Sequence, residues 1–185
     1  MTAAPSRIAV LLEDGFDDDA LELVLARLDE SGQVAVLIGP VAGRAYRSRD
    51  GRTTRIAAAS PAGVARPPFA GLIIPAGYAA DRLRLRHAVL DLVRGAIADR
   101  TPVGAIGHGA QVLISAGVIS GRTVTCWPSI AVDVKNAGAR YVDRPVVADD
   151  GVITARKADD AAAFVAAVLQ AIQRSTAPSA DDTIP

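Results

Sequence analysis

The sequence predicts an α/β protein with a flavodoxin-like, doubly wound parallel sheet, helices on both faces and a small β-hairpin, all in a single domain. Short β-branched apolar runs alternate along the chain with longer segments whose apolar residues recur at helical spacing. The strand runs are apolar throughout, which is typical of parallel strands that are buried on both faces. A length of 185 residues with 50% hydrophobic residues is enough for one sizeable core.

The first half of the chain predicts three buried strands, one helix and a hairpin. The helix ends at Ser31-Gly32, and Asp50-Gly51 is a turn signal inside the hairpin. In order, the elements are a strand at Ile8–Leu12, a helix at Ala20–Glu30, a strand at Val34–Ile38, a hairpin within Arg47–Ala58 and a strand at Leu72–Ile74.

The second half continues the alternation and closes with a long amphipathic helix. The elements are helices at Arg86–Asp99, His108–Ala116, Ile130–Asn136 and Asp159–Gln173, strands at Pro102–Ile106 and Arg122–Cys126, and a hairpin formed by Val146–Ala148 and Val152–Ala155. We expect residues 1–174 to form the domain. Residues 175–185 are polar, contain proline and lack periodicity, which predicts a disordered tail.

Composition narrows the class of protein. The formal net charge is zero, which gives no basis for binding nucleic acid or an acidic membrane surface. The single cysteine, Cys126, forms no internal disulfide, and this suits a reducing compartment. The N-terminus lacks the pattern of a signal peptide, and no apolar stretch is long enough for a membrane span. We therefore expect a cytoplasmic protein.

The segment VGAIGHGAQVLISAGV, from Val103 to Val118, predicts a sharp turn from strand to helix with Gly107 at its tip. Such a turn strains the tip residue and directs backbone N–H groups and the positive end of the helix at the space above it. Ligands of parallel sheets bind at the carboxyl ends of the strands. The loops Glu13–Asp19, Pro75–Asp81 and Gly107–Gly109 are expected to meet there.

Four stretches together resemble the ThiJ/PfpI family, within the class I glutamine amidotransferase-like superfamily. They are GRAYRSRDGRTTRI, GLIIPAGYAADRLR, AIGHGAQVLISAGVISGR and VTCWPSIAVDVKNAGARYVDRPVVADDGVITARKADD, and the similarity covers residues 6–173. Members of the family carry a cysteine at the tip of the elbow, a glutamate that hydrogen-bonds it and a neighbouring histidine. Their activities include peptide hydrolysis and hydration reactions, and some act as chaperones. The resemblance also implies a homo-oligomer, such as a dimer or a larger ring.

This chain departs from the family pattern at the central positions. Gly107 stands in place of the cysteine, Asp17 in place of the glutamate, and Ala76 in place of the first glycine of the oxyanion loop. His108 and Gly77 are retained. Because position 107 has no side chain, a thiol mechanism at the elbow is excluded.

We expect Asp17 and His108 to act as an acid–base pair around the space that the thiol would fill. The backbone amides of Gly77, Gly107 and Gly109 would stabilise developing negative charge. The resulting expectation is a cysteine-independent hydrolase or hydratase, or a lyase or isomerase. Its substrate would be a small carbonyl-containing metabolite, and biosynthetic tailoring would suit such a repurposed pocket. No metal or other cofactor is expected.

Plainer interpretations stand beside these roles. Asp17 precedes a helix, where an acidic side chain caps N–H groups, and its neighbours Asp18 and Asp19 are expected to stay mostly solvated. His108 at a helix start caps the helix or bonds to a neighbour.

For the function of the whole protein, the alternative is a non-catalytic ligand-binding or chaperone-like protein. A further alternative is an engineered cysteine-to-glycine variant of a thiol hydrolase or hydratase, although the paired change at Asp17 favours a natural origin.

Three more residues are candidates for the pocket. Cys126 is either a wall residue and relocated nucleophile or, as we favour, a small buried side chain. Trp127 is either a wall that stacks on a flat ligand or part of the core. Tyr78 follows the Gly77 turn, within reach of the same pocket.

Overall fold

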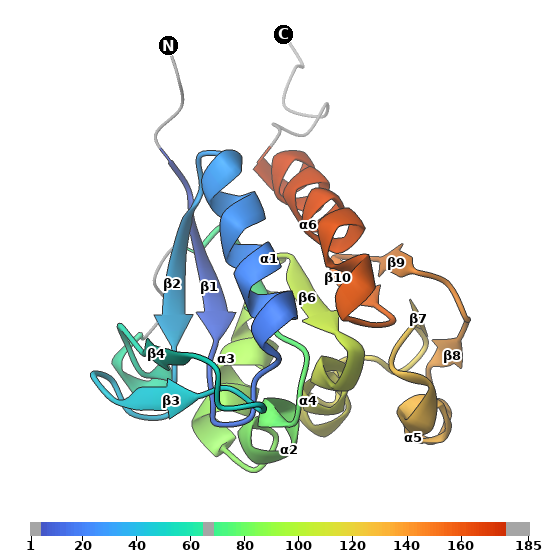
Figure 1. Cartoon of the computed structure of the whole chain (residues 1–185). Coiled ribbons are helices and arrows are strands. Elements are labelled where there is room, and N and C mark those ends of the chain that lie inside the picture. The colour runs from blue at the N-terminus through green and yellow to red at the C-terminus, as the bar shows by residue number, and fades with distance from the viewer. Residues whose placement is uncertain (1–4, 65–68, 177–185) are drawn as a thin grey trace, which may run out of the picture.

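The central feature of the fold is a six-stranded sheet in the order β2-β1-β5-β6-β10-β9. A computed structural model describes residues 5–64 and 69–176 of the chain (Figure 1). The first five strands of the sheet are parallel, and β9 pairs antiparallel with β10 at the edge. The strands are β1 Arg7–Leu11, β2 Val34–Ile38, β5 Gly71–Ile74, β6 Val103–Ile106, β9 Val146–Asp149 and β10 Val152–Ala155. The order of the parallel strands is that of flavodoxin-like sheets, so the predicted fold class is confirmed.

Helices cover both faces of this sheet. α1 (Asp18–Glu30) and α6 (Ala161–Thr176) lie side by side on one face, and α3 (His87–Ala98) and α4 (Ala110–Ala116) pack on the other (Figure 1). Gly104 shows how closely α6 approaches β6, because a Cβ atom at this position would lie 2.5 Å from the ring of the buried Phe164.

Both predicted hairpins form. The first consists of β3 (Ala45–Arg47) and β4 (Thr54–Ile56), an antiparallel pair outside the central sheet. In the second, Asp150 and Gly151 join β9 to β10 with positive φ angles of 45° and 79°, which is the geometry that two-residue hairpin turns require. Single 3₁₀ turns occur at Pro61–Gly63, Gly107–Gly109, Pro128–Ile130 and Ala158–Asp160.

Some predicted elements are wrong or incomplete. The strand expected at Arg122–Cys126 is shorter, since β7 comprises Thr123–Val124 and pairs with β8 (Arg140–Tyr141) in a separate two-stranded sheet. The sequence also gave no signal for β8 or for α2 (Ala79–Leu83), while α5 (Ala131–Asn136) was predicted correctly. α6 continues through Ser175 and Thr176, which we expected in the tail. The rest of the predicted tail, residues 177–185, lies outside the described residues.

Candidate functional site

Two loops at the carboxyl edge of the sheet are joined by backbone hydrogen bonds. The Asp17 N–H donates to the Ala76 carbonyl at 3.1 Å, and the Ala79 N–H donates to the Gly15 carbonyl at 3.2 Å. Gly77 lies in this contact with φ +102°, and a Cβ atom there would approach the Asp17 nitrogen and the Gly15 oxygen to 2.6 Å. Only glycine fits this position, so the loop after β1 and the loop after β5 form one continuous wall.

The turn from β6 to α4 contains two glycines with different physical roles. Gly107 has φ +57°, and a Cβ atom on it would meet only the Arg156 carbonyl oxygen at 3.6 Å and the Ala76 Cβ at 3.9 Å. Gly109 has an ordinary helical φ of −52°, but a Cβ atom there would lie 2.8 Å from the Ile74 carbonyl oxygen. Gly109 is therefore required for close packing on β5, whereas position 107 has room for a small side chain at the cost of a strained backbone angle.

A cleft of about 570 Å³ opens above this turn. It brings together six of the residues that the sequence singled out, namely Asp17, Gly77, Tyr78, Gly107, His108 and Trp127. Gly109 and Cys126 do not line it: Gly109 packs against β5, and Cys126 is fully buried. The cleft also includes residues that the sequence did not reveal, of which Arg49, Lys157 and Asp159 carry charge.

His108 lies near two aromatic rings. Its imidazole is 6.2 Å from the Tyr78 ring in an edge-to-face arrangement and 6.0 Å from the Trp127 ring in a stacked one, measured between ring centroids. Burial lowers the pKa of His108 below its ordinary value of 6.5, so the imidazole is neutral at pH 7. Its nitrogens form no hydrogen bond within the described parts of the chain, which leaves them free for a ligand or a proton.

Asp17 caps a helix and also lines the cleft. One carboxylate oxygen accepts a hydrogen bond from the Ala20 N–H at 3.0 Å and caps α1, while the other lies 3.3 Å from the Arg49 guanidinium. Its side chain is 14% exposed and lines the cleft. A carboxylate has about four acceptor sites, so both oxygens retain capacity for a water molecule or a substrate.

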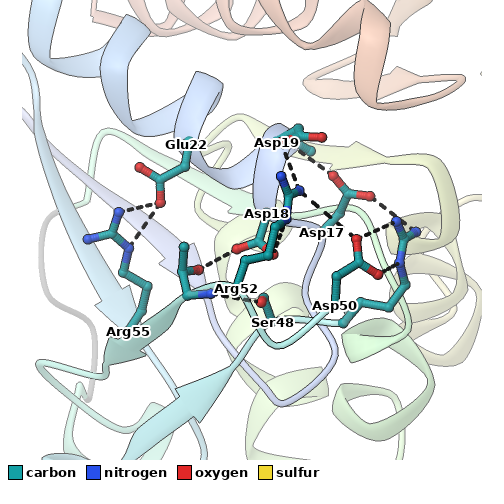
Figure 2. Close-up of polar contacts among 11 residues, drawn as sticks. Asp17, Asp18, Asp19, Glu22, Ser48, Asp50, Arg52 and Arg55 are labelled. Carbon is teal, nitrogen blue, oxygen red and sulfur yellow. Dashed lines mark hydrogen bonds and ion pairs between the residues drawn. The ribbon is translucent and has the colours of Figure 1, made fainter.

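The rest of the acidic run binds the β3–β4 hairpin, as Figure 2 shows. Asp19 is 81% exposed and lies 3.0 Å from the Arg52 guanidinium, but the expectation that Asp18 is solvated is wrong, because its side chain is 4% exposed. Burial by itself would raise the pKa of Asp18, yet hydrogen bonds from Thr53 and Ser48 and the charge of Arg52 hold it below the ordinary value of 3.8. Asp18 therefore anchors the hairpin beside the cleft.

Cys126 is not a candidate nucleophile. Its side chain is 0% exposed, and burial together with the charge of Asp133 raises the pKa of the thiol to about 12. The reactive form of cysteine is the thiolate, which is therefore negligible at neutral pH. The structure supports our preferred interpretation of Cys126 as a small buried side chain.

Glu13 is a buried carboxylate that sequence reasoning did not single out. It is 2% exposed, and its Oε1 accepts a hydrogen bond from the Asp14 N–H at 2.8 Å. Oε2 has no hydrogen bond but lies 4.0 Å from the Arg86 guanidinium. Because Glu13 does not line the cleft, we assign it no part in the site.

Residues 5–64 and 69–176 contain neither a metal-binding cluster nor a membrane-spanning helix. No group of three or more His, Cys, Asp or Glu side chains in this part of the chain is arranged to hold a metal ion. No helix in it is long and apolar enough to cross a membrane.

The fold and the site define a class of protein: a flavodoxin-like sheet whose strand-to-helix elbow forms the floor of a ligand-sized cleft. Comparison with known proteins then gives the family. Residues 6–171 match the model of the DJ-1/PfpI family, to which this chain belongs. The resemblance to the ThiJ/PfpI family is thus confirmed at the level of the family.

Individual relatives agree with this assignment. The chain is 36% identical over 159 residues to protein/nucleic acid deglycase 2 of Escherichia coli, an alignment that covers 85% of this chain and 92% of the relative. It is 34% identical over 158 residues to a putative cysteine protease of Bacillus subtilis, covering 85% and 93%. A two-domain protein from Anabaena variabilis, with DJ-1/ThiJ/PfpI-like and ferritin-like domains, superposes with a TM-score of 0.86 at 28% identity. The superposition covers 97% of this chain and 52% of the Anabaena chain.

Proposed function

We propose that this protein is a cysteine-independent enzyme that performs acid–base chemistry on a small carbonyl-containing molecule in the elbow cleft. Gly107 is proposed to stand where the family places its cysteine. The observation that carries the proposal is the cleft itself, which gathers His108, the carboxylate of Asp17 and the backbone of Gly77 and Gly107 around one space. Burial lowers the pKa of His108, which favours its neutral form.

In the proposed mechanism, His108 accepts the proton. It is the stronger candidate because burial lowers its pKa and its imidazole has no hydrogen-bond partner among the described residues. In Asp17, by contrast, one oxygen already accepts a hydrogen bond and the other is paired with Arg49. The carboxylate of Asp17 would stabilise the imidazolium as it forms and orient the group that loses the proton. The amides at the start of the elbow turn would stabilise negative charge on the carbonyl oxygen.

Two reaction types are compatible with this machinery. In a hydration, His108 takes a proton from water, the hydroxide oxygen bonds to the carbonyl carbon, and the imidazolium returns the proton to the carbonyl oxygen. In a hydrolysis, the same attack is followed by cleavage of the bond between the acyl carbon and its leaving group, which takes the proton from the imidazolium. In an isomerisation, His108 takes a proton from the carbon next to the carbonyl and returns it to another atom of the resulting enolate. In an elimination, the enolate expels a leaving group from the β-carbon, and this group takes the proton. Neither reaction requires a thiol, in agreement with the buried, protonated state of Cys126.

The names of the relatives support carbonyl or acyl chemistry in the family, since one is a deglycase and another a putative cysteine protease. For this chain we propose that the pocket has kept the family's means of polarising a substrate and has lost its covalent step.

The test is turnover by defined variants. Purified protein is incubated with a panel of small aldehydes, ketones, esters and amides, and consumption is followed by proton NMR in water and in D₂O. We expect one substrate class to react or to exchange its α-protons, and His108→Gln to lower the rate by about 100-fold or more. Asp17→Asn keeps the helix cap and tests the carboxylate alone. Cys126→Ser is the matched control and is expected to retain full activity.

A non-catalytic binding protein is the second candidate, because both carboxylate oxygens of Asp17 have structural partners. Specific binding of a small molecule without consumption or proton exchange, unchanged in Asp17→Asn, would favour it over the enzyme. Turnover that persists in His108→Gln would refute the proposed mechanism.

A further inference from the structure

The distribution of aromatic side chains adds information about the ligand. The chain has one Trp, three Tyr and three Phe, all within the described residues, and only Tyr78 and Trp127 are exposed. Their exposed fractions are 62% and 41%. Both line the elbow cleft, and each lies near the His108 ring. A large aromatic side chain held in water has an unsatisfied apolar surface, which a bound ring would cover.

At the elbow the cleft is lined by small residues. Ala76, Gly77 and Gly107 line the cleft, and the nearest atom to a Cβ built at Gly107 is 3.6 Å away. A planar molecule can therefore approach the backbone of the elbow with its edge while its face meets the aromatic side chains. A bulky, saturated ring would lose the face contact.

The charged side chains that line the cleft indicate which ligand charges it accepts. Asp17, Asp19 and Asp159 carry negative charge there, and Arg49 and Lys157 carry positive charge. Both cations are already paired, because the Arg49 guanidinium lies 3.3 Å from Asp17 and the Lys157 ammonium 2.6 Å from Asp159. The third carboxylate, Asp19, pairs with Arg52 at 3.0 Å, so the lining of the cleft offers no unpaired cation to an anionic group.

We infer that the ligand of this cleft is a flat, conjugated ring compound that is neutral or cationic and presents a carbonyl at its edge. It would stack on Trp127 and Tyr78, with the carbonyl directed at the backbone of Gly107. This inference rests on the cleft of the proposed function but makes a separate claim, namely the chemical class of the ligand.

The test measures binding of three probes to the full chain by calorimetry. The probes are 2-quinolone, which is flat and neutral, octahydro-2-quinolone, its saturated counterpart, and quinoline-2-carboxylate, which is anionic. We expect 2-quinolone to bind at least about three-fold more tightly than either counterpart. Trp127→Ala and Tyr78→Ala are each expected to weaken it roughly three- to ten-fold, with Trp127→Phe restoring most of the loss.

Ile56→Ala is the matched control, because Ile56 is also an exposed apolar side chain, at 63%, but lies outside the cleft. Equal affinity for 2-quinolone and its saturated counterpart would overturn the inference. So would a conversion from dimer to monomer in Trp127→Ala by sedimentation, since the two rings would then be covered by a second copy of the chain.

The two proposals fail independently. Binding of 2-quinolone without turnover of any carbonyl compound would sustain the ligand class and refute the enzyme. Turnover of small aliphatic aldehydes by a protein that does not bind 2-quinolone would sustain the enzyme and refute the ligand class.

Discussion

The glycines around the cleft allow one physical argument to be tested by a graded series of alanine substitutions. Gly107→Ala places a Cβ in ordinary contact, 3.6 Å from the nearest atom, so its cost comes from the φ of +57°. A left-handed conformation costs a non-glycine residue about 1–2 kcal/mol, and the reduced entropy of the unfolded chain offsets part of this. We expect a net loss of about 1 kcal/mol in the free energy of unfolding.

The other members of the series separate backbone strain from steric overlap. Gly32 has φ +69° with no atom within 4 Å of a Cβ, so Gly32→Ala measures the strain alone and should match Gly107→Ala. Gly109→Ala has no strain, but its Cβ would lie 2.8 Å from the Ile74 oxygen, which predicts about 1–3 kcal/mol from overpacking. Gly77→Ala combines φ +102° with two approaches of 2.6 Å, and we expect about 3 kcal/mol or more.

The assay is urea unfolding followed by far-ultraviolet circular dichroism, with each variant compared at an unchanged m-value. The expected order of destabilisation is Gly77→Ala first, then Gly109→Ala, with Gly107→Ala and Gly32→Ala equal and smallest. A loss in Gly107→Ala as large as that in Gly77→Ala would mean that the space above the elbow is filled, and the reasoning on the cleft would be refuted.

Three further predictions concern the ionisable groups. In native protein at pH 8, Cys126 should not react with a thiol reagent, because its side chain is buried and its thiol is protonated. The Gly107→Cys variant should show one additional thiol that reacts rapidly. Rapid labelling of the wild-type protein would contradict the burial of Cys126. Trp127 fluorescence should titrate with a midpoint below pH 6.5, because a protonated His108 quenches the indole 6.0 Å away; His108→Gln should abolish the titration and His87→Gln should not. Because the pKa of His108 is lower in the folded than in the unfolded state, the unfolded chain binds more protons below pH 6.5. The melting temperature should therefore fall as pH drops from 6.5 towards 5, and it should fall less in His108→Gln.

The elements that the sequence predicted are those with a strong local signal. Continuous apolar runs located β1, β5 and β6, and helical periodicity located α3 and α6 to within a few residues. The elbow was predictable for the same reason, since a strand, a small tip residue and a helix follow one another without interruption. β8 has two residues and α2 five, which is too short for any period to be visible. β8 is held by its neighbour, with the Arg140 N–H donating to the Arg122 carbonyl at 2.8 Å.

The sequence predicted the surroundings of site residues that depend on their neighbours in the chain. It did not predict those that depend on contacts with residues far away in the sequence. An acidic run before a helix predicts solvated caps, and Asp19 behaves so. Asp18 is buried because Thr53 and Arg52, far along the chain on the hairpin, supply a hydrogen bond and a charge. No pattern within a short window of sequence contains such a pairing. The same holds for Arg49, whose contact with Asp17 exists only because the hairpin folds against α1.

The contact between Arg49 and Asp17 bears directly on whether this cleft is built for chemistry. The Arg49 side chain is 41% exposed and also lies 3.0 Å from Asp50, so its interaction with Asp17 is shared and screened by water. Ion pairs in such surroundings contribute up to about 1 kcal/mol. In the proposed reaction, an imidazolium at His108 or a polar group of the substrate would use the remaining lone pairs of Asp17 beside Arg49. The pair holds the carboxylate at the wall of the cleft in the free protein without withdrawing it from the proposed reaction.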